Sequence, residues 1–492
     1  MSTSYGKVRD QLNQTGCGFC LAKWTQVTMH LGVGLTHSCH HPVQHKIPLA
    51  ELKRNPSALH NTRFKKLKRK EMLEGKRPSE CNYCWNVEDN SDSFSDRTFK
   101  SAEPWSLDQM EKIKASNWRD NYNPRYVEVS FSNTCNLKCA YCGPQYSSKW
   151  VEEIEKHGEY KTSTEFNSIK LLKERDEMPI LKSQHNPYID AFWEWWPDLY
   201  PDLHTFRITG GEPLLSPDTF KVLEYIQENW EQNPNLSLAI NTNLAVPDKL
   251  IQKMLTMAED LVNNNKVREL IIFTSVEAIG KQAEYTRWGL KYDKFWENVD
   301  EICTRLPKVT VNIMAAFNAL SVFTYGELVD KVLEMKKKHN NRERYWTTAV
   351  QLDTAYIRWP MHLSVKILED KDKKHILDAA TKALHYGSNK MTSMTYGFTD
   401  VEIQKIKRVY PRPHAAETIC GARILGRSPA QNWKKGPRTM ASGFIGRNRL
   451  CMGLQRKGQL DENVPGAPGV QKEERNDFCK SQYPSIWIGK YC

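Results

Sequence analysis

The chain has 492 residues, of which 39% are hydrophobic and 26% charged, a composition typical of a soluble protein with a packed core and more than one domain. No apolar run approaches the roughly 20 residues of a membrane-spanning helix, and the N-terminus lacks the hydrophobic stretch of a secretory signal. We therefore expect a cytoplasmic protein without a membrane partner, whose thirteen cysteines bind metal rather than form disulfides. The net charge of +12 permits a nucleic-acid partner but does not indicate one.

The first predicted unit, residues 16–89, is rich in residue types that bind metals. It contains the cysteines Cys17, Cys20, Cys39, Cys81 and Cys84 and the histidines His37, His40, His41 and His45. Thiolates are soft ligands that suit both zinc and iron–sulfur clusters, so the residues by themselves leave both kinds of site open.

Two segments of the N-terminal part have a readable pattern. Residues 24–30 resemble a β-strand, and residues 61–75 form a basic helix that either contacts phosphates or is a solvated face. Residues 90–123 are polar and interrupted by Pro104, so they are predicted to be a linker with one short helix at 107–115.

A second group of cysteines follows the predicted strand at 126–132 and precedes a helical pattern. Cys135, Cys139 and Cys142 lie on one short loop. Three thiolates can bind three irons of a four-iron, four-sulfur cluster, and the fourth iron is then open to a small molecule, as a catalytic metal site requires. A zinc knuckle and three unrelated buried thiols are the alternatives, because thiolates do not by themselves distinguish the metals.

Strand-like and helix-like segments then alternate through a predicted domain of residues 124–360. Strands are predicted at 126–132, 204–209, 236–242, 269–276, 308–317 and 348–357, and helices at 217–230, 247–263, 292–304 and 322–338. Six strands with helical crossovers predict an α/β fold with a parallel sheet. The longer connection at 159–202 includes an aromatic helix at 188–196, which is predicted to pack in the core or to cover the sheet.

The C-terminal part is less regular. Residues 361–410 are predicted to be a helical extension and residues 411–492 a basic, irregular tail. Four cysteines in the tail are too irregularly spaced to predict a further cluster: Cys420, Cys451, Cys479 and Cys492. Cys303 lies in a helical pattern and is predicted to be buried. Asp353 and Tyr356, near the end of the sixth strand, are candidates to reach a substrate.

A glycine-rich loop follows the second predicted strand of the domain. Gly210 and Gly211 come directly after strand 204–209 and are followed by Glu212 and Pro213. The two glycines let the backbone come close to a ligand, and the carboxylate can accept hydrogen bonds from an ammonium group.

Together these motifs resemble the radical S-adenosylmethionine (radical SAM) enzymes. The cysteine loop, with Tyr141 before its last cysteine, is similar to the signature of that superfamily, and the Gly-Gly-Glu-Pro loop is similar to its second motif. The resemblance implies a partial (β/α)6 barrel and a catalytic [4Fe–4S] cluster on Cys135, Cys139 and Cys142. The cluster would reductively cleave S-adenosylmethionine to a 5′-deoxyadenosyl radical. An electron donor such as flavodoxin or ferredoxin is implied as a partner.

The resemblance also implies a set of cofactor-binding residues. They are Tyr141, Gly210, Gly211, Glu212, Pro213, Asn241, Ser275, Glu277 and Arg287. Glu212 would contact the amino group of the cofactor, and Arg287 would pair with its carboxylate. The chain departs from the superfamily pattern at two positions: Asn243 stands in place of a glycine, and Glu277 stands in place of an aspartate, which puts the contact of that residue in doubt.

The N-terminal unit resembles a twitch module, the shorter relative of the SPASM domain. The likeness implies an auxiliary [4Fe–4S] cluster on Cys20, Cys39, Cys81 and Cys84, and Cys20 is favoured over Cys17 because Trp24 follows at the spacing of the module. Such modules usually follow the radical domain, whereas this one precedes it.

We therefore expect a two-cluster radical SAM enzyme that acts on an unidentified substrate, such as a peptide or protein, a sugar or a cofactor precursor. One alternative is a radical SAM enzyme that modifies RNA. Another, from a different class, is a non-enzymatic nucleic-acid-binding protein stabilised by zinc, which would leave the loop at 135–142 and the Gly-Gly-Glu-Pro loop unexplained. Binding to RNA would weaken steeply with salt.

Overall fold

The computed structural model describes residues 4–162, 166–339, 348–387 and 396–409. The strands are β1 (Gln26–His30), β2 (Leu35–His37), β3 (His45–Lys46), β4 (Tyr126–Ser130), β5 (Lys138–Cys139), β6 (Thr205–Thr209), β7 (Ser237–Thr242), β8 (Glu269–Ser275), β9 (Arg287–Trp288), β10 (Thr310–Phe317) and β11 (Val350–Tyr356). In this part of the chain, no helix combines the length and the apolar character that crossing a bilayer requires. The predicted tail at 411–492, with its four cysteines, lies outside the described residues.

The helices connect these strands and flank them. They are α1 (Tyr5–Thr15), α2 (Ala22–Thr25), α3 (Leu49–Leu52), α4 (Arg63–Leu73), α5 (Asn82–Asn90), α6 (Asp96–Ser101), α7 (Pro104–Leu107), α8 (Met110–Ala115), α9 (Ser148–His157), α10 (Ile169–Glu174), α11 (Pro187–Leu199), α12 (Pro217–Asn229), α13 (Asp248–Asn263), α14 (Gly280–Thr286), α15 (Tyr292–Arg305), α16 (Tyr325–Lys338), α17 (Asp370–Gly387) and α19 (Asp400–Val409). The six strands and four helices predicted between 126 and 357 are confirmed to within three residues at each end.

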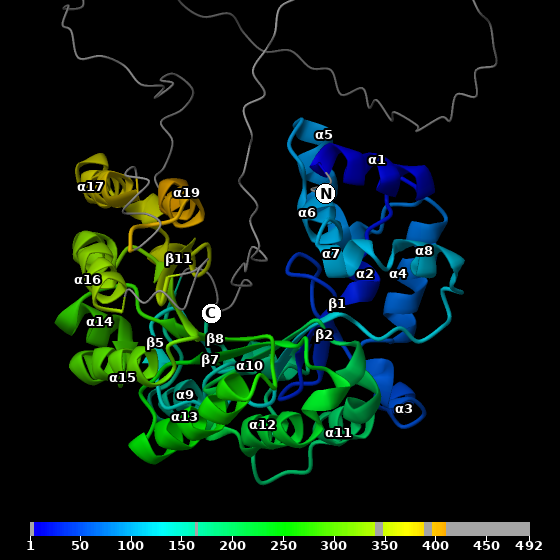
Figure 1. Cartoon of the computed structure of the whole chain (residues 1–492), viewed down its shortest axis with the longest axis horizontal. Coiled ribbons are helices and arrows are strands. Elements are labelled where there is room, and N and C mark those ends of the chain that lie inside the picture. Colours follow the sequence, from blue (N-terminus) through cyan, green and yellow to red (C-terminus); the bar gives the residue numbers. More distant parts are fainter. Residues whose placement is uncertain (1–3, 163–165, 340–347, 388–395, 410–492) are drawn as a thin grey trace, which may run out of the picture. The chain divides into compact units, whose positions relative to one another are not determined.

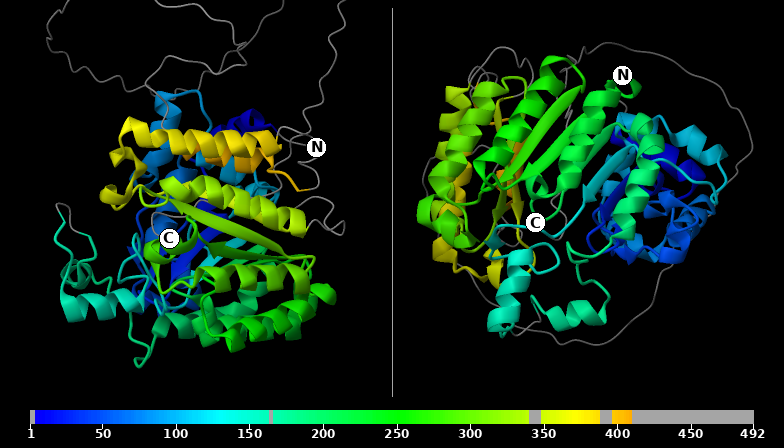
Figure 2. Two further views of the ribbon diagram at one scale, coloured as in Figure 1. Left: turned by 90° about the vertical axis from the view of Figure 1, so that its left-hand side faces the viewer. Right: turned by 90° about the horizontal axis from the view of Figure 1, so that it is seen from below.

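The main sheet has the strand order β11-β10-β8-β7-β6-β4-β1-β2-β3. Six strands of this sheet are all parallel and lie next to one another in chain order, as Figure 2 shows: β4, β6, β7, β8, β10 and β11. Helical crossovers between parallel strands account for this arrangement. The prediction of an α/β fold with a parallel sheet is therefore confirmed.

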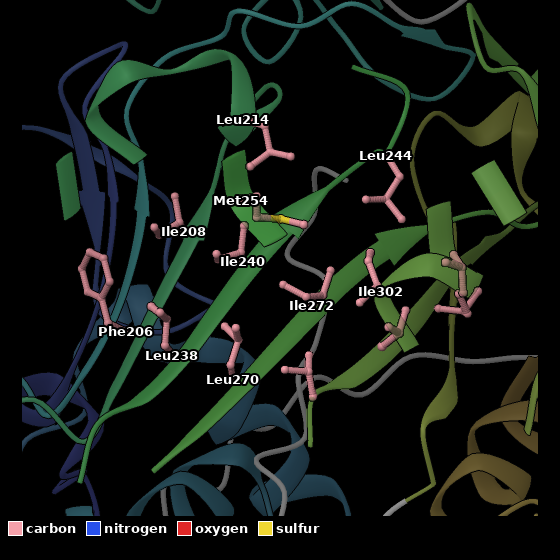
Figure 3. Packing of buried hydrophobic residues seen from close by; sticks show 14 of the residues in the cluster. Phe206, Ile208, Leu214, Leu238, Ile240, Leu244, Met254, Leu270, Ile272 and Ile302 are labelled. Atoms are coloured by element: carbon pink, nitrogen blue, oxygen red, sulfur yellow. The ribbon is translucent and has the colours of Figure 1, made fainter. Parts of the chain in front are cut away.

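The core lies between this sheet and the helices that follow its strands. Phe206, Ile208, Leu238, Ile240, Leu270 and Ile272 project from β6, β7 and β8 to one side (Figure 3). There they meet Met254 of α13 and Ile302 of α15, which are also buried. The prediction that Cys303 is buried in a helix is confirmed, because it lies in α15 with 4% of its surface exposed.

The N-terminal strands continue the same sheet. β1 pairs in parallel with β4, from Gln26 against Tyr126 to His30 against Ser130, and β2 pairs antiparallel with β1. Figure 1 shows the helices of this part, in blue, gathered beyond β1. The predicted strand at 24–30 begins two residues later, because Trp24 and Thr25 end helix α2.

The prediction of a single short helix in the linker at 90–123 is wrong. This segment contains three short helices, α6, α7 and α8, rather than one. Met110, Ile113 and Tyr122 are buried in a second core with residues of α1, α2 and α5. Met110 and Ile113 belong to α8, which overlaps the one helix that was predicted, whereas α6 and α7, with six and four residues, are too short to show a helical period. The boundaries of the predicted domains remain predictions.

The basic helix predicted at 61–75 is present as α4, but it is not simply a solvated face. Lys65 and Arg69 are fully buried on its inner side, where Lys65 Nζ lies 2.8 Å from His60 Nδ1 and Arg69 Nη1 donates to Asn61 Oδ1 at 2.8 Å. Two of the charges that suggested contacts with phosphates therefore point into the protein.

Candidate functional site

The three cysteines of the loop at 135–142 lie at the carboxyl end of β4. As whole residues, all three are partly exposed. Cys139 lies in the two-residue strand β5, which pairs antiparallel with β9 so that Cys139 stands opposite Arg287. In parallel α/β sheets, ligands bind at this edge, where the carboxyl ends of neighbouring strands meet.

The backbone and the β7 loop surround Cys135 with hydrogen-bond donors. The N–H of Leu137 lies 3.5 Å from its Sγ, and Nδ2 of Asn243 lies 3.9 Å away. Asn243 Nδ2 also donates to Asn136 Oδ1 at 2.9 Å, so it ties the end of β7 to the cysteine loop. Sequence analysis did not predict these contacts, because Asn243 only marked a departure from the superfamily pattern.

Cys139 is held by a buried ion pair. Arg287 Nε donates to Glu277 Oε2 at 2.8 Å, and its Nη1 lies 3.5 Å from Cys139 Sγ. The hydroxyl of Tyr141 donates to the same Glu277 oxygen at 3.3 Å. Arg287, which the resemblance assigns to a cofactor carboxylate, therefore already pairs with a protein carboxylate, and the cofactor contacts of Arg287, Glu277 and Tyr141 remain predictions.

Burial and the neighbouring groups set the protonation of these thiols. Burial raises the pKa of Cys139 to about 12, although the nearby Arg287 lowers it. The pKa of Cys135 is also raised, by burial first and then by the neighbouring Cys139. Only thiolates bind metal, so a cluster that supplies positive charge would offset the cost of ionising thiols in this position.

The Gly-Gly-Glu-Pro loop packs directly against the cysteine loop. The N–H of Gly211 donates to Ser132 O at 3.1 Å, and that of Glu212 donates to Thr134 O at 2.7 Å. A Cβ on Gly211 would lie 2.4 Å from Thr134 O, and Gly210 has a φ of +128°. The two glycines thus let this loop approach the backbone before Cys135. From the sequence, they were expected to let the loop approach a ligand.

The carboxylate of Glu212 is buried and joins two strand ends. Its Oε1 accepts hydrogen bonds from the N–H of Leu214 and the hydroxyl of Thr242, and its Oε2 accepts one from the N–H of Asn243 at 2.6 Å. Burial raises the pKa of Glu212 to about 7 in spite of these bonds. Glu212 has a structural function in this arrangement, and its contact with an ammonium group remains a prediction.

The other predicted residues of this edge have varied surroundings. Pro213 begins a short 3-10 helix, and Ser275 is the last residue of β8. Asn241 Oδ1 accepts a hydrogen bond from Arg207 Nε at 2.9 Å. Of the two substrate candidates, Asp353 is buried and lies 2.8 Å from Lys405 Nζ, whereas the hydroxyl of Tyr356 accepts from Arg358.

Four N-terminal cysteines line a cavity of their own, apart from the loop at 135–142. Cys20, Cys39, Cys81 and Cys84 face it, whereas Cys17 is not among the residues that line it and lies 4.0 Å from the carbonyl oxygen of Gly75. Within the described residues, no group of three or more His, Cys, Asp or Glu side chains is arranged to hold a metal ion. The four thiols are nevertheless close enough to affect one another, because the pKa of Cys39 is raised by burial and then by the other three.

Buried cations surround this cavity. Lys23 pairs with Glu80, Arg97 pairs with Glu88 at 2.9 Å, and both cations are almost fully buried. Lys100 also lines the cavity. Positive side chains beside a buried cavity compensate the negative charge of thiolates that line it. This holds for thiolates that bind zinc and for thiolates that bind an iron–sulfur cluster.

One of the four histidines named in the sequence analysis lines the cavity with the cysteines. His41 does so, and its Nε2 lies 2.6 Å from Asp96 Oδ2. His37 Nδ1 contacts the carbonyl oxygen of Cys39, and His45 Nε2 contacts Thr62 Oγ1 at 2.9 Å. These three histidines therefore each contact a group of the protein other than a cysteine thiol.

Comparisons with known proteins give several weak but consistent matches. No protein-family profile matches the chain. It is 24% identical over 221 residues to the GTP 3′,8-cyclase of Sulfurimonas denitrificans, a match that covers 45% of this chain and 54% of the relative. It is 25% identical over 167 residues to the probable GTP 3′,8-cyclase of Methanococcus maripaludis strain C5, which covers 32% of this chain and 44% of the relative.

The solved structures that match include the crystal structure of Streptococcus suis SuiB bound to precursor peptide SuiA. The sequences are 13% identical, the TM-score is 0.34, and the match covers 77% of this chain and 71% of the other. The chain spans only about half of the length of the two curated relatives above. These relatives agree with the resemblance to the radical SAM superfamily that the cysteine loop and the Gly-Gly-Glu-Pro loop carry.

Proposed function

We propose that the chain cleaves S-adenosylmethionine reductively and uses the product to modify a small-molecule or peptide substrate. The observation that carries the proposal is the packing of the Gly-Gly-Glu-Pro loop on the backbone next to Cys135. This packing brings the predicted cluster ligands and the predicted cofactor loop to one edge of the sheet. When bound, the cluster would supply the electron that cleaves the cofactor to methionine and a 5′-deoxyadenosyl radical.

The residues of the chain would hold and orient these groups. Cys135, Cys139 and Cys142 would bind three irons, and Asn243 and Arg287 would direct N–H groups at two of the sulfurs. Hydrogen bonds to cluster sulfurs tune the reduction potential, so these two residues belong to the function of the site as well as to its structure. Tyr141, Glu277 and the strand-end residues Asn241 and Ser275 would contact the cofactor.

The proposal extends to the N-terminal unit as a twitch-like module with an auxiliary cluster. Its support is the cavity lined by Cys20, Cys39, Cys81 and Cys84, with buried cations beside it. The sheet from β4 to β11 would correspond to the partial (β/α)6 barrel of the superfamily. A flavodoxin or ferredoxin would deliver electrons.

Iron analysis after anaerobic reconstitution tests the proposal. We expect about eight irons per chain from two four-iron clusters and slow release of 5′-deoxyadenosine with dithionite and S-adenosylmethionine. The triple variant C135A/C139A/C142A should lose about half of the iron and release no 5′-deoxyadenosine.

Cys17→Ala is the matched control, because Cys17 is also a partly exposed cysteine but does not line the cavity. It should keep all of the iron. Equal release of 5′-deoxyadenosine by the wild type and the triple variant would overturn the proposal.

A further inference from the structure

Helix α4 has a buried side and a basic outer side. Lys65, Arg69 and Met72 recur at helical spacing and are buried. Arg63 and Leu67 lie on the opposite side, where both are exposed. In Figure 1, α4 is one of the N-terminal helices drawn in blue. The outer side of this helix is therefore open to solvent.

Two neighbouring segments extend the outer side of α4. Lys66 Nζ donates to Asn121 Oδ1 at 2.7 Å, and Asn55 Nδ2 donates to the same oxygen at 3.1 Å. The guanidinium of Arg119 stands 4.1 Å from the centre of the Trp118 ring. These contacts join three segments into one surface, here called the α4 surface, which comprises the exposed and partly exposed side chains of residues 51–54, 63–76 and 117–121.

The α4 surface carries twice as many cations as carboxylates. Its cations are Lys53, Arg54, Arg63, Lys66, Lys68, Lys70, Lys76 and Arg119. Its carboxylates are Glu51, Glu71, Glu74 and Asp120. Eight positive and four negative side chains give this surface a net charge of +4.

Most of these cations have no carboxylate as a close partner. Glu71 pairs with Lys68, and Glu74 pairs with both Lys70 and Lys76. Five cations remain that have no carboxylate oxygen within 4.0 Å among the described residues: Lys53, Arg54, Arg63, Lys66 and Arg119.

Lysines on other helices of the chain do have such partners. Three examples are Lys170 with Glu174, Lys281 with Glu284 and Lys331 with Glu334. A helix that only faces solvent can pair its lysines in this way, one turn along its own surface. The α4 surface instead leaves its positive charge available to an anionic partner.

The α4 surface also exposes apolar side chains between its charges. Leu67 is 41% exposed and Phe64 is 40% exposed, and Lys68 Nζ lies 5.6 Å from the centre of the Phe64 ring. A single strand of nucleic acid presents phosphates together with the flat faces of unpaired bases, which stack on aromatic rings and guanidinium groups. An acidic protein segment would match the charge but not these flat groups.

We propose that the α4 surface binds a single-stranded segment of RNA. RNA fits better than DNA because unpaired bases are ordinary in RNA loops, whereas DNA is mostly double-stranded. Arg54, Arg63 and Lys66 contact the phosphates of the strand. Phe64 and the guanidinium of Arg119 stack on its bases. The inference goes beyond the proposed function and does not depend on it, because the binding requires no cofactor.

Fluorescence anisotropy of a labelled single-stranded RNA of about 20 nucleotides, mixed with the reconstituted full-length protein, tests this binding. Five cations without carboxylate partners predict a slope of about −3.5 when the logarithm of the association constant is plotted against the logarithm of the salt concentration. The affinity should therefore fall about a hundredfold between roughly 50 and 200 mM salt.

The triple variant R54Q/R63Q/K66Q should bind the RNA more weakly at low salt, and its slope should be smaller in magnitude by about 2. Circular dichroism checks that it is folded. If loss of the contact between Lys66 and Asn121 disturbs the fold, R54Q/R63Q provides the comparison, with a slope smaller in magnitude by about 1.4.

The variant K170Q/K281Q/K331Q is the matched control, because it removes the same number of positive charges from α10, α14 and α16. It should keep the slope of the wild type. The inference would be overturned if the wild type did not bind the RNA at low salt, or if R54Q/R63Q/K66Q had the same slope as the wild type.

Two other polyanions identify the partner of the surface. Single-stranded DNA of the same sequence and poly-glutamate are measured in the same way. Tighter binding of the RNA than of either polymer supports the proposal. Poly-glutamate that binds as tightly as the RNA would assign the surface to an acidic protein, and DNA that binds as tightly would exclude a specific RNA partner, so either result would overturn the proposal.

Discussion

The buried pair of Arg287 and Glu277 is expected to fix the position of Cys139, and its removal should destabilise the protein in a characteristic way. Glu277 is fully buried, Arg287 is 5% exposed, and Nε and Oε2 are 2.8 Å apart. Arg287→Met keeps most of the side-chain volume but leaves the carboxylate without its cation. Removal of one partner of a buried pair costs about 3–5 kcal/mol, whereas replacement of both by neutral residues is nearly neutral.

The pH dependence of this loss has a definite sign. Burial raises the pKa of Glu277, while Arg287 lowers it. Without Arg287 the pKa rises further, so the folded state binds a proton that the unfolded state has released, and stability falls as the pH rises through this range. The loss in Arg287→Met should therefore be larger at pH 8 than at pH 5.

Thermal unfolding of the metal-free chain under reducing conditions measures the effect without a contribution from cluster loss. For a cooperative unit of roughly 400 residues, an unfolding entropy of about 0.8 kcal/mol/K converts a loss of 3–5 kcal/mol into a fall of about 4–6 °C in Tm. The double variant R287M/E277Q should recover most of this fall. After reconstitution, the cluster in R287M should have a more negative reduction potential, because a donor and a positive charge next to Cys139 are gone.

Arg305 and Glu259 provide the control, since the same residue types pair at 2.9 Å but are 28% and 32% exposed. Arg305→Met should lower the Tm by about 1 °C or less, because exposed pairs contribute about 0–1 kcal/mol. A Tm of R287M within 1 °C of the wild type would refute the reasoning. So would losses from R287M and E277Q that simply add in the double variant, because residues in contact should be coupled.

Two further predictions concern the cofactor loop and the N-terminal cavity. The pKa of Glu212 is about 7, and only its ionised carboxylate attracts an ammonium group. The affinity of the reconstituted protein for S-adenosylmethionine should therefore rise with pH up to about 7 and then level off. Calorimetry should find this dependence lost in Glu212→Gln, and an unchanged pH profile in that variant would exclude the contact. Changing Cys81 and Cys84 to Ala should remove about half of the iron, which iron and zinc analysis would measure. Stoichiometric zinc at this site in the wild type would show that the proposal of an auxiliary iron–sulfur cluster is wrong.

Much of the fold could be predicted from the sequence because it depends on local patterns. Apolar runs and helical periods reveal β4 to β11 and their crossovers, since each element must bury one side of its own surface. The cysteine loop and the Gly-Gly-Glu-Pro loop were recognisable for a similar reason, because each is a short, continuous motif at the end of a strand.

The tertiary structure decided what those motifs touch. Pairing of β1 with β4 joins the N-terminal unit to the sheet, and packing turns Lys65 and Arg69 inward. Folding also separates Cys17 from the cavity that Cys20 lines, and pairs Arg287 with Glu277, ten residues away. These outcomes depend on contacts between segments far apart in the chain or on opposite sides of a turn. No local pattern encodes such contacts, because the partner of a charged or small residue is chosen by the burial and packing of the whole fold.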